Sequence, residues 1–151
     1  MKLSTRGRYG MRAMMDLAMN DGDGAVLLKD IASRQGISLK YLEQLVTPLR
    51  AAGLIRGVRG AHGGYSLARP AKEIRLSEIL YALEGSPAPV DCAEERFPCD
   101  LKSCTGCATQ EIWQEMFHAI DQILENRTLQ GLANRQAHLM REHAEALSYS
   151  I

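Results

Sequence analysis

Residues 27–53 read LLKDIASRQGISLKYLEQLVTPLRAAG and contain the most specific structural signals of the chain. Its first part is apolar at helical spacing and predicts a short helix, which ends where Gly36 permits a left-handed turn. Ser38 then supplies the N-cap of a second helix, in which Pro48 is expected to cause a bend or to lie close to a change of direction. The predicted buried face of this second helix holds Leu39, Leu42, Leu45, Val46 and Leu49. Two short helices joined by a tight turn are typical of a helix-turn-helix unit, placed here at residues 28–51.

A glycine-rich hairpin follows the two helices. Residues 55–59 alternate as a strand, RGAHGGY at 59–65 forms a glycine-rich turn, and residues 65–67 return as a second strand. A two-stranded hairpin directly after a helix-turn-helix unit is a wing, placed here at residues 55–68. Residues 25–27 are expected to add a short strand to the sheet of this wing.

Helices are predicted on both sides of this unit. Apolar residues at helical spacing indicate a first helix over residues 5–20 and a short helix over 77–84, which complete a winged helix-turn-helix domain at 1–84. Residues 85–108 carry closely spaced prolines and every cysteine, and we expect a cysteine-rich loop there. Residues 109–151 are predicted to hold a dimerisation helix and a C-terminal helix. The predicted fold class is therefore mainly α with a small β-hairpin wing.

The predicted long helix over residues 110–126 has a wide apolar stripe. The stripe consists of Ile112, Trp113, Met116, Phe117, Ile120, Ile123 and Leu124. It is broader than a helix needs to cover one small domain, which suggests that a second chain packs on it. Thr128 is expected to cap a last helix that runs to about Met140, followed by polar and mobile residues.

Charge is unevenly divided along the chain. Residues 1–70 hold 11 Lys and Arg against 5 Asp and Glu, whereas residues 71–151 hold 7 against 13, so the total net charge is zero. A basic half beside an acidic half favours a polyanion, here double-stranded operator DNA, as the partner of the first half. Arg12 and Asp16 interrupt the apolar residues near the N-terminus, and no stretch of about 18 uncharged apolar residues occurs. We therefore expect a cytoplasmic protein with no membrane partner.

The exposed face of the second helix carries the side chains expected to read DNA. A recognition helix presents polar side chains to base edges and basic side chains to phosphates. Glu43 is a special case, because a carboxylate repels phosphate but accepts a hydrogen bond from the amino group of cytosine. Arg59 on the glycine-rich wing is suited to a narrow minor groove. The predicted DNA-binding residues are Ser38, Lys40, Tyr41, Glu43, Gln44, Arg50, Arg59 and His62. An ordinary solvated helix surface is the competing interpretation.

All four cysteines lie within DCAEERFPCDLKSCTGC at residues 91–107, with the spacing Cys92-x6-Cys99-x4-Cys104-x2-Cys107. Such crowding in a cytosolic chain favours metal or redox chemistry over structural disulfides. Thiolates are soft ligands that select zinc, copper(I) or iron–sulfur clusters. Structural zinc usually takes two short cysteine pairs, and only Cys104 and Cys107 form one. The spacing therefore favours an iron–sulfur cluster over zinc, and zinc over a metal-free thiol switch.

No arrangement of residues in the sequence resembles an enzyme site. The chain lacks a Ser/His/Asp order, a phosphate loop and an HExxH motif, and its four histidines show no ligand spacing. A redox enzyme that uses the Cys104–Cys107 pair stays open as an alternative, which predicts turnover of a dithiol substrate and no sequence-specific DNA binding. We expect a DNA-binding regulator and not an enzyme.

Several segments together resemble the IscR/NsrR-type winged-helix repressors of the Rrf2 family. They are MKLSTRGRYGMRAMMDLA at the N-terminus, ISLKYLEQL at 37–45, VRGAHGGYSLA at 58–68, the cysteine loop and the start of the long helix. The resemblance covers nearly the whole chain and is strongest to IscR-type members. It implies a transcriptional repressor or dual regulator that senses iron–sulfur status, redox state or nitric oxide. It also implies a homodimer, in which the long helix crosses to the partner's DNA-binding domain, and a cluster, with 2Fe–2S favoured over 4Fe–4S.

The resemblance further implies which cysteines are ligands. The third cysteine of the family stands six residues before a tryptophan, which identifies Cys107 here, and Cys92 and Cys99 match the first two. IscR-type members use a histidine three residues after the third cysteine, where this chain has Gln110. Nitric-oxide-sensing relatives use a carboxylate of the first helix, where this chain has an arginine. Cys104 is therefore the expected fourth ligand.

Overall fold

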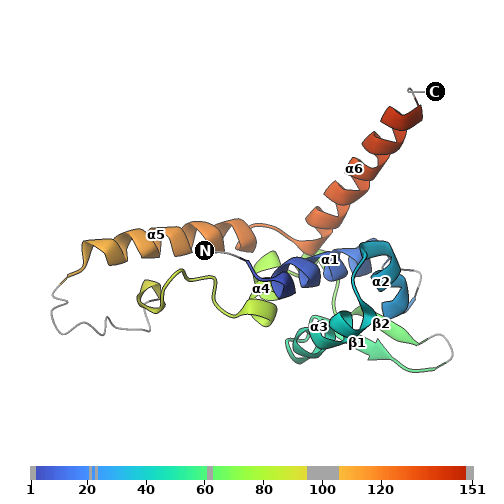
Figure 1. Ribbon diagram of the computed structural model, residues 1–151, viewed down its shortest axis with the longest axis horizontal. Helices are drawn as coiled ribbons and strands as arrows, with labels where there is room; N and C mark the ends of the chain where they lie inside the picture. Colours follow the sequence, from blue (N-terminus) through green and yellow to red (C-terminus); the bar gives the residue numbers. More distant parts are fainter. Residues whose placement is uncertain (1–2, 21, 23, 61–62, 95–105, 149–151) are drawn as a thin grey trace.

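The computed structural model describes residues 3–20, 22, 24–60, 63–94 and 106–148, which Figure 1 shows as a ribbon. These residues form six α-helices, one two-stranded hairpin and two short 3-10 turns. In chain order the elements are α1 (Thr5–Met19), α2 (Leu28–Gln35), α3 (Leu39–Ala51), β1 (Ile55–Val58), β2 (Gly64–Leu67), η1 (Ala71–Glu73), α4 (Leu76–Glu84), η2 (Asp91–Ala93), α5 (Ala108–Glu125) and α6 (Leu129–Ser148). The predicted fold, mainly α with a β-hairpin wing, is confirmed.

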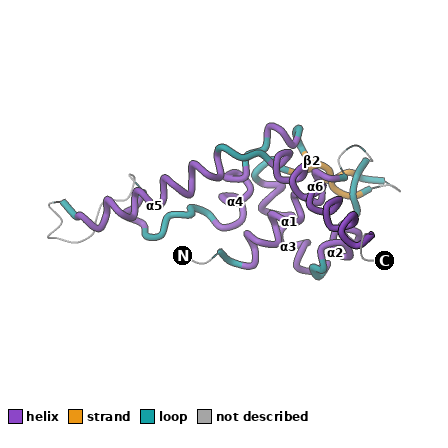
Figure 2. The backbone as a smooth tube through the Cα atoms, turned by 90° about the horizontal axis from the view of Figure 1, so that it is seen from above, coloured by secondary structure: helices purple, strands orange, loops and turns teal. Residues whose placement is uncertain are grey.

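Helix α1 lies at the centre of the molecule and contacts α2, α3, α4, α6 and β2 (Figure 2). Its buried residues include Ala13, Met14 and Leu17, which recur at helical spacing. The almost fully buried side chains around α1 come from α2, α3, α4, α6 and the segments before β1 and after η1: Ile31, Leu42, Leu45, Leu49, Leu54, Ile74, Ile79 and Leu129. One cluster of buried residues therefore joins the helix-turn-helix unit, the wing, α4 and the start of α6.

Two glycines let α1 approach α4 closely. A Cβ atom at Gly10 would overlap the side chain of Leu83, and one at Gly7 would lie 2.6 Å from Oε1 of Glu84. The carboxylate of Glu84 caps α1, because it accepts hydrogen bonds from the hydroxyl of Ser4 and, at 2.7 Å, from the backbone N–H of Gly7. A carboxylate is favourable at this end of a helix, where the first N–H groups have no intrahelical acceptors.

A buried carboxylate fixes α1 to α2. Asp16 is only 3% exposed, and its two carboxylate oxygens accept hydrogen bonds from Nη2 of Arg34 at 2.6 Å and from Nε of Arg34 at 3.0 Å. Nε2 of Gln35 donates to the same carboxylate at 2.9 Å. The hydrogen bond to Asp16 is the main reason why the pKa of Arg34 lies above its ordinary value. A forked pair of this kind fixes the angle between two helices as well as their distance.

Helix α6 begins in the core and then leaves it as an arm (Figure 1). Leu129 is fully buried, and Oγ1 of Thr128 accepts a hydrogen bond from the N–H of Gly131 at 3.1 Å, so the predicted cap is confirmed. The predicted end at about Met140 is wrong, because α6 continues to Ser148. The sequence beyond Met140 is rich in Arg, Glu, Ala and Leu, which are strong helix formers.

Helix α5 also projects from the body of the molecule, which it contacts through α4 and the η2 turn. The hydroxyl of Tyr81 in α4 donates a hydrogen bond to Oδ1 of Asp121 in α5 at 2.8 Å. Partial burial, followed by this bond and nearby carboxylates, raises the pKa of Tyr81 to about 12. Although α5 and α6 are long, no helix among the described residues has the apolar stretch needed to cross a membrane.

We expect Gly10→Ala to lower the free energy of unfolding by about 1–3 kcal/mol, because the added methyl group overlaps Leu83 in a tightly packed contact. Gly131→Ala is the matched control, since its Cβ would lie 3.5 Å from Oγ1 of Thr128, an ordinary contact. Alanine in this exposed helix position should raise stability by up to about 1 kcal/mol. Urea unfolding followed by circular dichroism measures both variants. Equal effects of the two substitutions would contradict the close α1–α4 contact.

Candidate functional site

Helices α2 and α3 form the predicted helix-turn-helix unit. Helix α2 ends at Gly36, whose φ of 63° is left-handed, and Ser38 caps α3 by accepting a hydrogen bond from the N–H of Tyr41 at 3.3 Å. Helix α3 continues through Pro48, which lies in its last turn and close to the change of direction at Gly53, where φ is 68°. Local glycine and cap signals in the sequence therefore set the geometry of this unit.

The exposed face of α3 holds most of the residues predicted to contact DNA. The exposed members are Ser38, Lys40, Glu43, Gln44 and Arg50. Leu39, predicted to be buried, is 43% exposed, so that prediction is wrong. It is the first residue of α3 and lies at the edge of the buried face, with the exposed Glu43 one turn later. Thr47, one further turn along, is also exposed. Its helical spacing from Glu43 would have identified it as a member of the same exposed face.

Tyr41 differs from these residues because it is half-buried and holds α3 against α1. Its hydroxyl lies 3.0 Å from Oγ1 of Thr5, within hydrogen-bond distance. Its ring meets the ring of Tyr9 edge to face, with centroids 5.8 Å apart. The first turn of α1 therefore lies beside the first turn of α3, and the exposed Arg6 and Arg8 of α1 add positive charge there. No local pattern in the sequence indicated that these two arginines lie beside α3.

The wing consists of β1 and β2, paired antiparallel with Ile55 opposite Leu67. The predicted third segment is present as one bridge, in which Val26 and Tyr65 exchange two backbone hydrogen bonds of 2.8 Å. Arg59 is exposed just beyond β1, whereas His62 lies outside the described residues. An exposed arginine missed by the sequence analysis, Arg56 on β1, donates from Nε to Oγ of Ser66 across the hairpin at 3.1 Å.

The structure describes two of the four predicted cysteine ligands. Cys92 lies in the η2 turn, and Cys107 stands at the N-cap of α5 with its Sγ 3.0 Å from Oγ1 of Thr109. Both cysteines are half-buried, whereas Cys99 and Cys104 lie outside the described residues. Within the described ranges no three His, Cys, Asp or Glu side chains come together as a metal site, a result that covers only two of the predicted ligands.

Gln110 joins the two segments that carry Cys92 and Cys107. Its side-chain Nε2 donates a hydrogen bond to the carbonyl oxygen of Cys92, and its backbone N–H donates to the carbonyl oxygen of Cys107, both at 2.9 Å. The η2 turn accordingly packs against α5. Figures 1 and 2 show this end of α5 at the opposite end of the molecule from the wing. Within one chain, the cysteine segment and the DNA-reading side are thus far apart.

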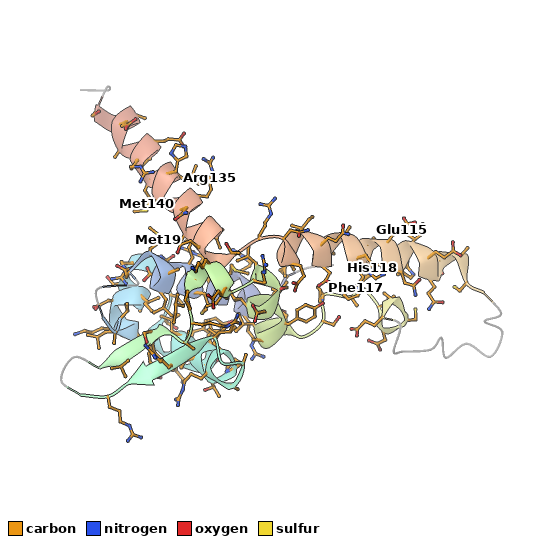
Figure 3. All side chains as sticks on the ribbon, turned by 180° about the vertical axis from the view of Figure 1, so that it is seen from behind. Met19, Glu115, Phe117, His118, Arg135 and Met140 are labelled. Carbon is orange, nitrogen blue, oxygen red and sulfur yellow. The ribbon has the colours of Figure 1, made fainter. Side chains whose placement is uncertain are left out.

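A groove of about 990 Å³ lies between α1 and α6. Its apolar lining includes Met11, Met15, Met19, Leu124, Leu132 and Met140. Figure 3 shows Met19 of α1 and Met140 of α6 on its two sides. Arg8, Arg12 and Arg34 also line this groove, and Arg34 is ion-paired with Asp16, which lines it too, so the net charge of the lining is positive through Arg8 and Arg12.

Helix α5 has two apolar faces. One face, with Trp113, Phe117, Ile120 and Leu124 half-buried, lies toward the body of the chain. The other holds Ile112, Met116 and Ile123, which are 53%, 39% and 56% exposed. These three positions share one side of a helix, because they are separated by four and seven residues. Figure 3 shows Phe117 and Glu115 on opposite sides of α5. The apolar face formed by Ile112, Met116 and Ile123 is therefore not packed against any other element among the described residues.

Comparisons with known proteins agree with this architecture. The profile of the Rrf2 family, described as "Iron-dependent Transcriptional regulator", matches residues 3–135. Protein rrf2 of Nitratidesulfovibrio vulgaris is 48% identical over 87% of both chains, and the HTH-type transcriptional regulator IscR of Photorhabdus laumondii is 39% identical over 90% of this chain and 81% of its own. The solved structure of CymR, the global cysteine regulator of B. subtilis, has a TM-score of 0.76 at 38% identity and covers 89% of this chain and 98% of its own. These similarities show that the chain belongs to the Rrf2 family and is a DNA-binding transcriptional regulator rather than an enzyme.

Proposed function

We propose that this regulator senses through an iron–sulfur cluster held by its cysteines, and that it acts as a homodimer on operator DNA in the cytoplasm, as a repressor or a dual regulator. The observation that carries the proposal is the meeting of two cysteine-bearing segments. Cys92 and Cys107 come from opposite ends of the cysteine segment, yet the η2 turn of Cys92 packs against the helix that Cys107 caps. Two thiols held at the base of one loop are a suitable start for a thiolate site.

The chemistry of the donor set fits an iron–sulfur cluster. Thiolates are the usual ligands of such clusters, and half-burial of Cys92 and Cys107 limits the access of water to the site. Cys99 and Cys104 are proposed as the other two ligands on the basis of their spacing in the sequence. When bound, a cluster supplies reversible one-electron chemistry and sensitivity to iron supply or nitric oxide, with 2Fe–2S favoured over 4Fe–4S by the likeness to IscR.

The DNA-binding residues are proposed on the basis of exposure and chemistry. Lys40, Glu43 and Gln44 lie on the exposed face of α3, where polar side chains suit base edges in the major groove. Arg59 beside the wing turn suits the minor groove. The remaining proposed contacts are Ser38, Tyr41, Arg50 and His62. The hydroxyl of Tyr41 is shared with Thr5, so we propose that it mainly fixes the position of α3.

A second copy of the chain is proposed to cover the exposed face of α5. Helix α5 has four carboxylates and no Lys or Arg, and Glu111 and Glu115 flank its exposed apolar face. The groove between α1 and α6 has the complementary character, apolar with Arg8 and Arg12 at its border. We therefore propose that α5 of each protomer lies in this groove of its partner, and burial of apolar area drives the association.

This dimer offers a route from the cysteines to the DNA. The cysteine end of α5 is remote from the wing of its own chain (Figure 1). In the proposed dimer the cysteine end of α5 would lie against α1 of the partner. Within each chain, α1 contacts the recognition helix α3 through Thr5 and Tyr41. Ligation by the thiolates would order the cysteine segment and so shift the population of the DNA-binding arrangement, which changes operator affinity by linkage.

A regulator with a thiol switch or a zinc site, and no cluster, is the second candidate. The similarity to CymR favours the thiol switch, because CymR of Staphylococcus aureus, which is 44% identical to this chain with a TM-score of 0.70, has a solved oxidized form. The same four cysteines would then act by oxidation or by zinc binding. The two candidates share the DNA-reading residues and the dimer, and they differ only in what the cysteines hold.

Arg59→Ala should weaken binding to an operator selected from random duplexes by about tenfold, because one base or minor-groove contact of this kind contributes about 1–3 kcal/mol. Arg141→Ala, which removes an exposed arginine from the α6 arm, is the control and should bind as the unchanged protein does. Fluorescence anisotropy at several salt concentrations measures both. An equal loss for the two variants would indicate a general charge effect and contradict the assigned role of the wing.

Ile123→Glu should convert the dimer to a monomer, because it places a charge within the proposed apolar interface, at its most exposed residue. Gln122→Glu adds the same charge at the neighbouring, exposed position and should leave the dimer intact. Sedimentation velocity distinguishes the two species. A dimer that survives Ile123→Glu would show that α5 is not the interface.

Protein purified without oxygen should be brown and contain iron and acid-labile sulfide in equal amounts. Cys107→Ala should lose the visible absorbance and most of the iron, because one ligand is missing, whereas Thr109→Ala keeps every thiol and should keep the colour. Zinc without sulfide would favour the zinc regulator, and four thiols free to react with iodoacetamide in metal-free protein would favour the thiol switch. Either result would overturn the cluster proposal.

A further inference from the structure

The side-chain hydrogen bond of Gln110 forms a connection across the base of the cysteine segment, and its backbone hydrogen bond belongs to the first turn of α5. The side-chain amide reaches the carbonyl oxygen of Cys92 at 2.9 Å, in a half-buried position. The backbone N–H of the same residue reaches the carbonyl oxygen of Cys107 at 2.9 Å. One residue thus contacts both cysteine-bearing backbones, and it uses their carbonyl oxygens rather than their thiols.

The turn that receives the side-chain amide is itself well defined. The N–H of Ala93 donates to the carbonyl oxygen of Val90 at 3.0 Å, and the N–H of Glu94 donates to that of Asp91 at 3.1 Å. Ala93 is only 1% exposed. The amide of Gln110 therefore holds a formed turn against α5, and the position of Cys92 relative to α5 depends on this bond together with the burial of Ala93.

We propose that Gln110 is a positioning residue, which closes the base of the cysteine segment and holds Cys92 and Cys107 ready to bind a thiophilic metal centre together. This inference rests on the proposed function of the cysteines as ligands. Bringing two ligands that are distant in the sequence together costs conformational entropy, and two ligands whose backbones are already held close lose less of it on binding. Partners that orient ligands in this way typically affect metal affinity by about 10–100-fold.

The chemistry of the bond requires a donor at position 110. The acceptor is a carbonyl oxygen, so the amide NH₂ of glutamine satisfies it, whereas the carboxylate of a glutamate of nearly the same shape would repel it. Gln110→Glu and Gln110→Ala should therefore both lose the hydrogen bond to the carbonyl oxygen of Cys92, although only the first keeps the size of the side chain. Gln114→Glu, one turn further along α5 and also half-buried, is the control for the added charge.

The first measurement is hydrogen–deuterium exchange of the full-length, metal-free protein. We expect the amides of Ala93 and Glu94 to exchange at least about fivefold faster in Gln110→Ala and Gln110→Glu, because the turn is released from α5. Gln114→Glu should exchange as the unchanged protein does. Unaltered exchange in both Gln110 variants would overturn the inference, whatever the cysteines bind. Circular dichroism and sedimentation confirm that each variant stays folded.

The second measurement is the affinity of the same proteins for cadmium(II), followed by the thiolate-to-metal absorption band in competition with a chelator. Both Gln110 variants should bind cadmium about tenfold more weakly than the unchanged protein and Gln114→Glu. Faster exchange with unchanged cadmium affinity would overturn the positioning role. Absence of the thiolate band from the unchanged protein would instead overturn the proposed function of the cysteines, so the two failures are distinguishable.

Discussion

The close approach of α1 to α4 at Gly7 and Gly10 is the constraint on which the rest of the structure depends. A Cβ atom at Gly10 would overlap Leu83, and one at Gly7 would displace the carboxylate of Glu84, so a larger residue at either position requires these side chains to move or the helices to separate. The short distance lets Glu84 cap α1 and places α1 in contact with the helix-turn-helix unit, the wing and α6. Because the interior is closely packed, a shift of α1 against α4 would displace side chains throughout the buried cluster that joins these elements.

Directional polar contacts then fix the DNA-reading unit on α1. The forked pair between Asp16 and Arg34 sets the angle of α2, and the contacts of Tyr41 with Thr5 and Tyr9 set the position of the first turn of α3. Apolar burial alone would tolerate small rotations of these helices, whereas hydrogen bonds depend on angle. The exposed face of α3 is consequently presented to solvent in one orientation, which base recognition requires.

The helix-turn-helix unit and α5, at the two ends of the molecule, differ in how fully their apolar residues are buried within one chain. The DNA-reading unit buries its apolar residues in its own core, and its polar face is exposed. Helix α5 instead half-buries one apolar face and leaves Ile112, Met116 and Ile123 exposed. This division agrees with the proposed function, in which each protomer makes its own DNA contacts and the apolar face of α5 is covered by the partner.

The helix-turn-helix unit and the wing could be predicted from the sequence, because their signals are local, and the cysteine site stays a prediction from spacing alone. Gly36 permits the left-handed turn, Ser38 caps α3, and the type and spacing of cysteines indicate their chemistry. Only the tertiary structure decided that Leu39 is exposed, that Gly10 faces Leu83, and that Gln110 donates to the turn of Cys92. Each of these features depends on which distant segment lies opposite a residue, and a local pattern of residue types contains no information about that segment.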